Sequence, residues 1–184
     1  MKDFLYSLFI GLFGIAGLTS IAFLLMYVAQ SKQQAHLYSN LAAVREQDTQ
    51  QEILSQSSVQ PTSRNLYLEN SDMVGWIQIE GTSIDYPVMQ TPADPNYYLK
   101  HDFEKHYTDY GCPFMQADCD ALAPSDNLII YGHNMKDGSM FADLAKYRSK
   151  DFWQAHKTVR FDTALGGSAY EIFAVIHTTV QADA

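Results

Sequence analysis

The sequence predicts a small, mainly β domain with short helices, carried behind a single membrane-spanning helix. Three observations support this fold class: an uncharged apolar stretch at the amino terminus, several short runs of strand-forming residues, and one helical stretch between two of those runs. Short strands around one helical crossover are typical of a mixed-topology β-barrel or sandwich.

The amino-terminal segment is expected to be an uncleaved transmembrane anchor. Residues 4–29 contain no charged side chain, and a helix needs only ~20 apolar residues to cross a bilayer. A cleaved signal peptide is the alternative, but its apolar core would be only about 7–15 residues long. We therefore predict an anchor over residues 1–32. Lys2 and Lys32 lie on opposite sides of the span, so the positive-inside rule gives only a slight preference for one orientation.

Residues 33–64 are expected to separate this anchor from a folded domain at residues 65–184. The stretch is rich in Gln, Ser and Ala, carries scattered apolar residues and ends near Pro61. Its composition fits either a loosely helical stalk or a disordered linker. Both alternatives would hold the domain away from the bilayer.

The predicted domain is acidic. Residues 65–184 contain seventeen Asp and Glu against eight Lys and Arg, so they account for the whole formal net charge of −9. Such a domain is repelled by the phosphates of nucleic acids. We therefore expect no nucleic-acid partner.

The domain is expected to begin with a β-hairpin. Residues 76–80 and 84–88 each alternate apolar and polar side chains, and residues 81–83 have the composition of a turn. Pro87 cannot donate a backbone hydrogen bond, so it predicts an edge strand or the end of a strand.

Two further strands and a helical stretch are expected next. Residues 112–115 suit a short strand, and residues 128–131 have the length and the β-branched and aromatic content of a buried strand. Helical spacing then links Met140, Leu144 and Tyr147, and a second short helical piece is expected around residues 152–153.

The last predicted elements are strands. Alternation resumes at residues 159–161, the pair at 166–167 predicts a turn, and residues 170–180 are expected to form one long strand. An apolar edge such as residues 172–176 is normally covered in a native domain. The pattern therefore predicts a barrel that lacks its last strands within these 184 residues.

His133 is the candidate for chemistry. It follows Gly132 at the end of the predicted strand 128–131, and such strand-to-loop junctions often carry functional side chains. A lone histidine is more often structural or solvated, so this position alone does not assign a role.

The remaining candidate groups have structural explanations. Cys112 and Cys119 lack a second Cys/His pair at zinc-ligand spacing and are expected to be ordinary buried or partly buried thiols. Asp72 and Asp85 adjoin turns, where aspartate makes local hydrogen bonds. We expect no metal and no organic cofactor, and no loop has the ligand spacing of an EF-hand. The other histidines of the domain are expected to be solvated or, for the last, on a barrel face: His101, His106, His156 and His177.

The domain resembles the class B sortases, the membrane-anchored cysteine transpeptidases of Gram-positive bacteria. The order of six segments carries the resemblance, and the most specific of them begins Tyr131-Gly132-His133-Asn134. The segments are residues 70–77, 81–88, 96–99, 111–115, 131–141 and 170–173. The resemblance implies a sortase-type β-barrel outside the cell membrane, with the amino terminus in the cytoplasm.

The resemblance also implies a reaction and a role for His133. Sortases cleave a sorting signal of the Asn-Pro-x-Thr-Asn or x-Pro-x-Thr-Gly kind through a thioacyl-enzyme, which an amine of the peptidoglycan cross-bridge or of a pilin lysine resolves. The chemistry needs a thiolate, a histidine and an arginine that stabilises the oxyanion. His133 matches the family's catalytic histidine. The expected partners are therefore surface proteins with sorting signals and cell-wall or pilin amines.

This sequence departs from the family in the other two catalytic residues. The family's cysteine follows a Thr-Leu-Ser-Thr motif, and no such motif occurs here. Cys112 and Cys119 lie in or just after an early strand segment, and Arg148 and Arg160 also fall at the wrong places. The nucleophile and the oxyanion arginine are thus expected to be absent from these 184 residues, which would be inactive alone. The alternative is a non-catalytic, membrane-tethered remnant or peptide-binding module.

Overall fold

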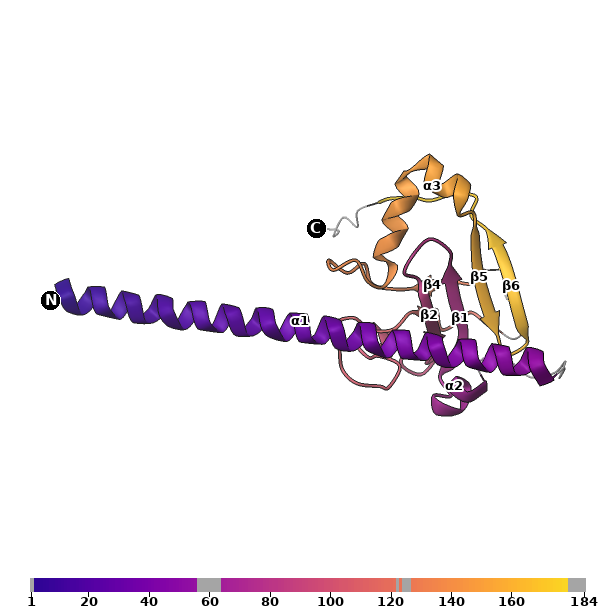
Figure 1. Ribbon diagram of the computed structural model, residues 1–184, viewed down its shortest axis with the longest axis horizontal. Helices are drawn as coiled ribbons and strands as arrows, with labels where there is room; N and C mark the ends of the chain where they lie inside the picture. The colour runs from indigo at the N-terminus through magenta and orange to yellow at the C-terminus, as the bar shows by residue number, and fades with distance from the viewer. Residues whose placement is uncertain (1, 56–63, 122, 124–126, 179–184) are drawn as a thin grey trace. The chain divides into compact units, whose positions relative to one another are not determined.

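The computed structural model describes residues 2–55, 64–121, 123 and 127–178. These residues form two compact units, Met1–Leu37 and Tyr38–Ala184. The first unit contains helix only, and the second contains a sheet with short helices (Figure 1). The predicted fold class is confirmed.

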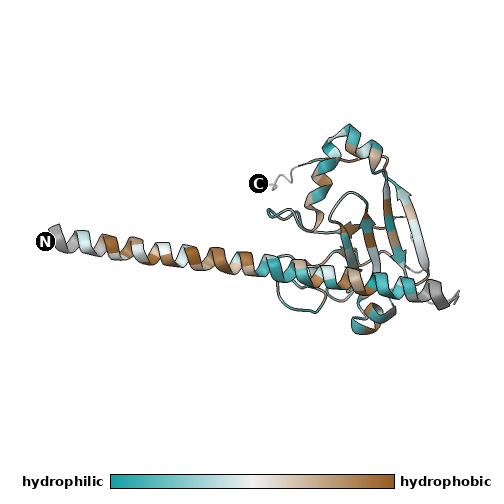
Figure 2. Ribbon diagram, in the orientation of Figure 1, coloured by the Kyte–Doolittle hydropathy of each residue, from teal (hydrophilic) through white to brown (hydrophobic). Residues whose placement is uncertain are grey.

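The first unit is the amino-terminal part of the long helix α1 (Lys2–Ser55). The sequence has no proline before Pro61, so nothing interrupts the helical hydrogen bonds of α1. Figure 2 shows mostly apolar residues along its amino-terminal part and more hydrophilic residues further along. By length and composition, α1 is suited to cross a membrane, and it contains the predicted span 4–29.

The stretch between the predicted anchor and the predicted domain differs from the expectation. Residues 33–55 continue α1 without a break, whereas residues 56–63 of the predicted stalk lie outside the described residues. The second unit begins at Tyr38, not at residue 65. The reason is packing, because Tyr38 and Leu41 are each only 5% exposed and contribute to the core.

The sheet of the second unit has six strands in the order β4-β3-β2-β1-β5-β6. Every neighbouring pair is antiparallel except β2 and β3, which are parallel. The strands are β1 (Met73–Ile79), β2 (Asp85–Met89), β3 (Phe114–Met115), β4 (Ile130–Tyr131), β5 (Thr158–Thr163) and β6 (Gly166–Glu171). The predicted hairpin is confirmed as β1 and β2.

Short helices lie between or before these strands. The predicted helical stretch is confirmed as a 3-10 helix, η2 (Phe141–Arg148), followed by α3 (Lys150–Ala155), in which Ser149 caps the amino terminus by accepting from Phe152 N. Two others precede β1 and β3: α2 (Arg64–Glu69) and η1 (Tyr97–Leu99).

Pro87 lies in an interior strand, so the prediction of an edge strand is wrong. It pairs with Trp76 of β1, and Ile79 N donates to Ile84 O at the hairpin end. Hydrogen-bonded pairs alternate along an antiparallel ladder, so the position of Pro87 directs its nitrogen away from β1. On the other side, β3 pairs with β2 only at Met89. The missing N–H therefore costs no ladder hydrogen bond.

The core lies on β1 and β2 and on the segments that cover them. Trp76, Ile84, Val88 and Met89 are at most 1% exposed. The second-unit part of α1 packs against this sheet. The ring of Tyr38 meets the ring of Tyr86 in β2 edge-on, with 5.1 Å between the ring centroids. Burial of one large apolar side chain stabilises a fold by roughly 1.5–3 kcal/mol, so these central strands hold the unit together.

The predicted long strand at residues 170–180 is wrong. Strand β6 ends at Glu171, which pairs with Thr158 at the start of β5. Residues 172–178 have no regular structure, and 179–180 lie outside the described residues. One further backbone hydrogen bond, from Ile172 N to Lys157 O at 2.7 Å, follows the last strand pair. The chain before Lys157 belongs to the end of α3, so the ladder does not continue beyond it. Phe173 and Ile176 are consequently 94% and 85% exposed. The turn lies at residues 164–165, and the two glycines predicted to form it begin β6.

Candidate active site

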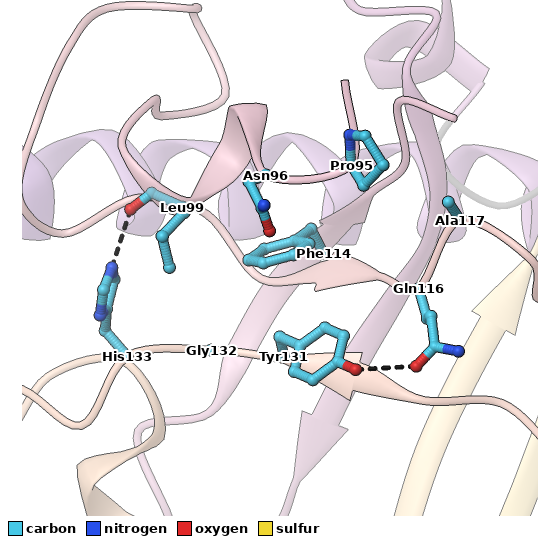
Figure 3. Close-up of a pocket in the computed structure, with 9 residues that line it drawn as sticks. All are labelled: Pro95, Asn96, Leu99, Phe114, Gln116, Ala117, Tyr131, Gly132 and His133. Atoms are coloured by element: carbon cyan, nitrogen blue, oxygen red, sulfur yellow. Dashed lines mark hydrogen bonds between the residues drawn. The ribbon is translucent and has the colours of Figure 1, made fainter. Parts of the chain in front are cut away.

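An open groove of about 430 Å³ lies beside β3 and β4 (Figure 3). The segment that leads into η1 and ends at Leu99 forms its opposite wall. Its lining residues are Pro95, Asn96, Leu99, Phe114, Gln116, Ala117, Tyr131, Gly132 and His133. The groove thus collects residues from three of the segments that carry the family resemblance.

Strand β4 brings His133 to this groove, although the strand differs from its prediction. It spans Ile130–Tyr131, lies at one edge of the described sheet and is partly exposed, with Tyr131 44% exposed. The expected buried strand at 128–131 is therefore wrong in length and burial. An apolar run of this size has no periodicity that distinguishes an edge from a centre.

Gly132 is required by close packing, not by a turn. It is not among the glycines with positive φ. A Cβ at this position would lie 2.5 Å from the ring of Phe141, which is inside the van der Waals limit. The close approach lets Phe141 N donate to His133 O at 2.8 Å. The backbone of His133 is thereby tied to the start of η2.

The side chain of His133 is held by a main-chain carbonyl across the groove. Its Nε2 lies 2.8 Å from Leu99 O, as Figure 3 shows. A carbonyl oxygen can only accept, so Nε2 donates and carries the proton in the neutral ring, which leaves Nδ1 as the basic nitrogen. The residue is half-buried. The imidazole is therefore oriented and remains accessible for proton transfer.

Tyr131 and Gln116 form a second polar position in the groove. The Tyr131 hydroxyl donates to Gln116 Oε1 at 2.7 Å, and the Tyr131 ring packs against Phe114 at 5.3 Å between centroids (Figure 3). Sequence patterns assigned no role to Gln116 or to the carbonyl of Leu99. A backbone carbonyl has no residue signature, so only the fold could reveal it.

The two cysteines are partly or fully buried free thiols, as predicted, and neither lines the groove. Cys112 is 2% exposed, and its Sγ lies 3.6 Å from Pro87 O. Burial raises the pKa of the Cys112 thiol far above its usual value. Cys119 is half-buried, and its Sγ donates to Asn127 O and accepts from Ile129 N. Both thiols are satisfied within the fold.

The prediction of solvated histidines is confirmed for His106 and wrong for His101 and His156. The side chain of His106 is 67% exposed. His101 instead stacks on Tyr97 at 3.9 Å. His156 ends α3 with its ring against Gly81, and its Nδ1 is buried without a hydrogen-bond partner, so it is not solvated. The sequence could not show this contact across 75 residues of chain. His177 lies exposed after β6 and not on a barrel face.

The two aspartates have structural partners, but those of Asp72 are distant in sequence and are not the expected local turn contacts. Asp72 accepts hydrogen bonds from the Tyr98 hydroxyl at 2.9 Å and from Lys105 Nζ at 2.8 Å. Asp85 accepts from Trp76 Nε1 at 2.6 Å. Partial burial raises the pKa of Asp72, but the hydrogen bonds from Lys105 and Tyr98 outweigh burial and leave this pKa below its usual value. Among the described residues, no group of three His, Cys, Asp or Glu side chains is placed to hold a metal ion.

Two relatives are similar to this chain. Sortase B of Listeria monocytogenes is 47% identical over 118 residues, which are 64% of this chain and 48% of that protein. Sortase B of Staphylococcus aureus is 35% identical over 126 residues, which are 68% of this chain and 51% of that protein. No protein-family model matches the sequence. The chain therefore spans about half the length of these curated relatives.

Solved structures of the same relatives agree with the fold. The structure of sortase B from Listeria monocytogenes is 47% identical, with a TM-score of 0.58 over 64% of this chain and 67% of that chain. A Staphylococcus aureus sortase B–substrate complex is 31% identical, with a TM-score of 0.71 over 78% of this chain and 64% of that chain. The chain belongs to the class B sortase family. Its sheet is part of a sortase-type β-barrel.

Proposed function

We propose that this chain carries the histidine-bearing part of a class B sortase, a cysteine transpeptidase. In that reaction a thiolate attacks a backbone carbonyl of the sorting signal and forms a thioacyl-enzyme as the peptide C–N bond breaks. The histidine gives its proton to the leaving amine. An amine of the peptidoglycan cross-bridge or of a pilin then attacks the thioester and releases the thiol.

The position of His133 is the observation that supports this role. Its imidazole lies at the wall of the open groove, oriented by Leu99 O and half-accessible. A catalytic acid or base must be both held and reachable, and imidazole is the side chain best suited to exchange protons near neutrality. His106 does not meet these two conditions, because its side chain is exposed and lies outside the groove.

The 184 residues by themselves are proposed not to turn over substrate. Cys112 is buried, and burial raises its thiol pKa, so this thiol is neither accessible nor ionised at neutral pH. Cys119 is engaged with Asn127 and Ile129 outside the groove. Arg148 and Arg160, on η2 and β5, also lie outside it. Neither arginine is therefore proposed to stabilise an oxyanion in the groove.

The proposed topology follows from α1 and from the family. Residues 4–29 would span the bilayer once, with the amino terminus in the cytoplasm and the second unit on the outer face of a Gram-positive cell. Surface proteins with sorting signals would reach the groove there. Protease treatment of intact cells should remove an epitope placed anywhere downstream of Asn65 at an exposed position, and protection of the epitope would contradict this orientation.

A chimaera tests the assignment of His133. In the chimaera, the carboxyl-terminal half of Listeria monocytogenes sortase B is fused to the end of this chain. Turnover of a sorting-signal peptide is then measured in the presence of an amine acceptor. His133→Ala should lower turnover by about 10²–10⁴, the usual contribution of a general acid or base. His106→Ala is the matched control and should keep the parent rate. An active chimaera that tolerates His133→Ala with unchanged thermal unfolding would contradict the assignment.

Peptide binding without turnover is a second candidate, because the groove is formed by these residues alone. A fluorescent sorting-signal peptide should then bind the 184-residue chain, and Tyr131→Ala should weaken binding by removing an aromatic wall of the groove. Equal binding of a scrambled peptide would contradict a recognition role.

A further inference from the structure

The carbonyl of Leu99 that orients His133 is itself packed against another main-chain segment. Gly111 lies so close that a Cβ there would be 2.5 Å from Tyr98 O and 2.7 Å from Leu99 O. Its φ of +59° is in the left-handed region, where glycine is free of strain. The next residue, Cys112, donates its N–H to Tyr98 O at 2.9 Å. Gly111 and Cys112 thus fix the end of η1.

Gly111 is in turn held by α1. The Tyr38 hydroxyl donates to Gly111 O at 2.6 Å, a buried contact between residues 73 positions apart. The Tyr38 ring is only 5% exposed and packs edge-on against Tyr86. A buried hydroxyl with a carbonyl partner has one favourable position, because the lost hydrogen bond is not replaced by water. The helix therefore determines where the Gly111 peptide lies.

These contacts form a continuous path from α1 to the groove. Tyr38 holds Gly111, Gly111 packs against the Leu99 carbonyl, and that carbonyl accepts a hydrogen bond from His133 Nε2. Each step is a main-chain or buried contact, so displacement of one moves the next. A rigid supporting layer of this kind is what keeps a reacting group within reach of its target.

We propose that Tyr38 and Gly111 are positioning residues for His133, acting through the carbonyl of Leu99. The proposal rests on the catalytic role proposed for His133, but its geometry does not depend on turnover. Tyr38 lies on the same helix as the predicted membrane anchor, in the part that belongs to the second unit. The helix that would tether the enzyme thus also orients its histidine.

Nuclear magnetic resonance on the full chain in detergent tests the path directly. In protein with ¹⁵N-labelled histidine, the Nε2 proton of His133 should be visible at pH 8.5 and low temperature, protected from exchange with water. Tyr38→Phe keeps the ring and removes only the hydroxyl. It should speed this exchange about three- to tenfold, the factor for one net hydrogen bond.

Tyr147→Phe is the matched control, because its hydroxyl also donates to a main-chain carbonyl, that of His156, at 2.7 Å. This variant should leave the His133 signal unchanged. Gly111→Ala should have a larger effect than Tyr38→Phe. Gly166→Ala also strains the backbone, at a φ of +134°, but has open space around the added Cβ and should leave the His133 signal unchanged.

Folded Tyr38→Phe protein with the exchange rate and ¹⁵N shifts of the parent would overturn the proposal, even if Gly111→Ala fails to fold. Equal effects of Tyr38→Phe and Tyr147→Phe would also overturn it, because they would indicate a general loss of stability. The chimaera separates the two proposals. An active chimaera that tolerates His133→Ala refutes the catalytic role and leaves this measurement intact.

Discussion

The two edges of the sheet differ in how much structure supports them. At the β4 edge, His133 is tied through its backbone to Phe141 and through its ring to Leu99. At the β6 edge, all six residues of the strand are exposed, and Phe173 beyond it is almost wholly solvated. Side-chain and backbone contacts thus hold the residues beside the groove in place, while the β6 side depends mainly on backbone pairing with β5.

A buried residue beside β3 should contribute far more to stability than an exposed residue beyond β6. Met89 is fully buried and pairs with Phe114, so Met89→Ala should reduce the free energy of unfolding by about 2–5 kcal/mol. Ile176→Ala changes a side chain that is 85% exposed and should stay within about 0.5 kcal/mol of the parent. Urea unfolding measures both. Comparable losses would mean that the β6 side is packed as tightly as the β4 side.

A smaller loss is expected from Gly132→Ala, because the added Cβ would overlap the ring of Phe141. Overpacking of this kind costs about 1–3 kcal/mol. Phe141→Ala in the same chain should relieve the overlap, so the double variant should be less unstable than the sum of the two single variants. Simple additivity in urea unfolding would show that Phe141 does not determine the glycine requirement.

The free energy of unfolding should depend on pH through Asp72, whose carboxylate accepts a hydrogen bond from Tyr98 in η1. Its pKa is lowered in the fold, so the ionised form contributes stability above the unfolded-state pKa of about 3.9 and loses it as pH falls through the folded-state pKa. Asp72 is partly exposed, so solvent screening limits the effect to roughly 0.5–1 kcal/mol.

Asp72→Asn should therefore be less stable than the parent at pH 7, and the difference should shrink at pH 2. Urea unfolding at the two values measures it. Asp109→Asn alters a more exposed ion pair with Lys100 and serves as the control. A difference between parent and Asp72→Asn that is the same at both pH values would show that the carboxylate charge is not what matters.

Local patterns in the sequence predicted the elements that depend on near neighbours. The hairpin of β1 and β2 follows from alternation around a turn, and the amino-terminal part of α1 follows from the uncharged apolar stretch at residues 4–29. The residues on either side of His133 are distinctive enough to single out this histidine from the others. In each case the decisive information lies in one continuous stretch of the chain.

The apolar helical span at residues 4–29, the hairpin, the family resemblance and the choice of His133 as the candidate could be predicted from sequence, because these rest on local periodicity and on side-chain identity. The packing of distant segments shows that β4 is an edge strand of the described sheet, that α1 contributes Tyr38 to the core, and that Leu99 O orients His133. It also ended β6 at Glu171, where its partner strand begins. These features depend on contacts between distant residues or on main-chain atoms, which every residue carries alike, so no residue pattern encodes them.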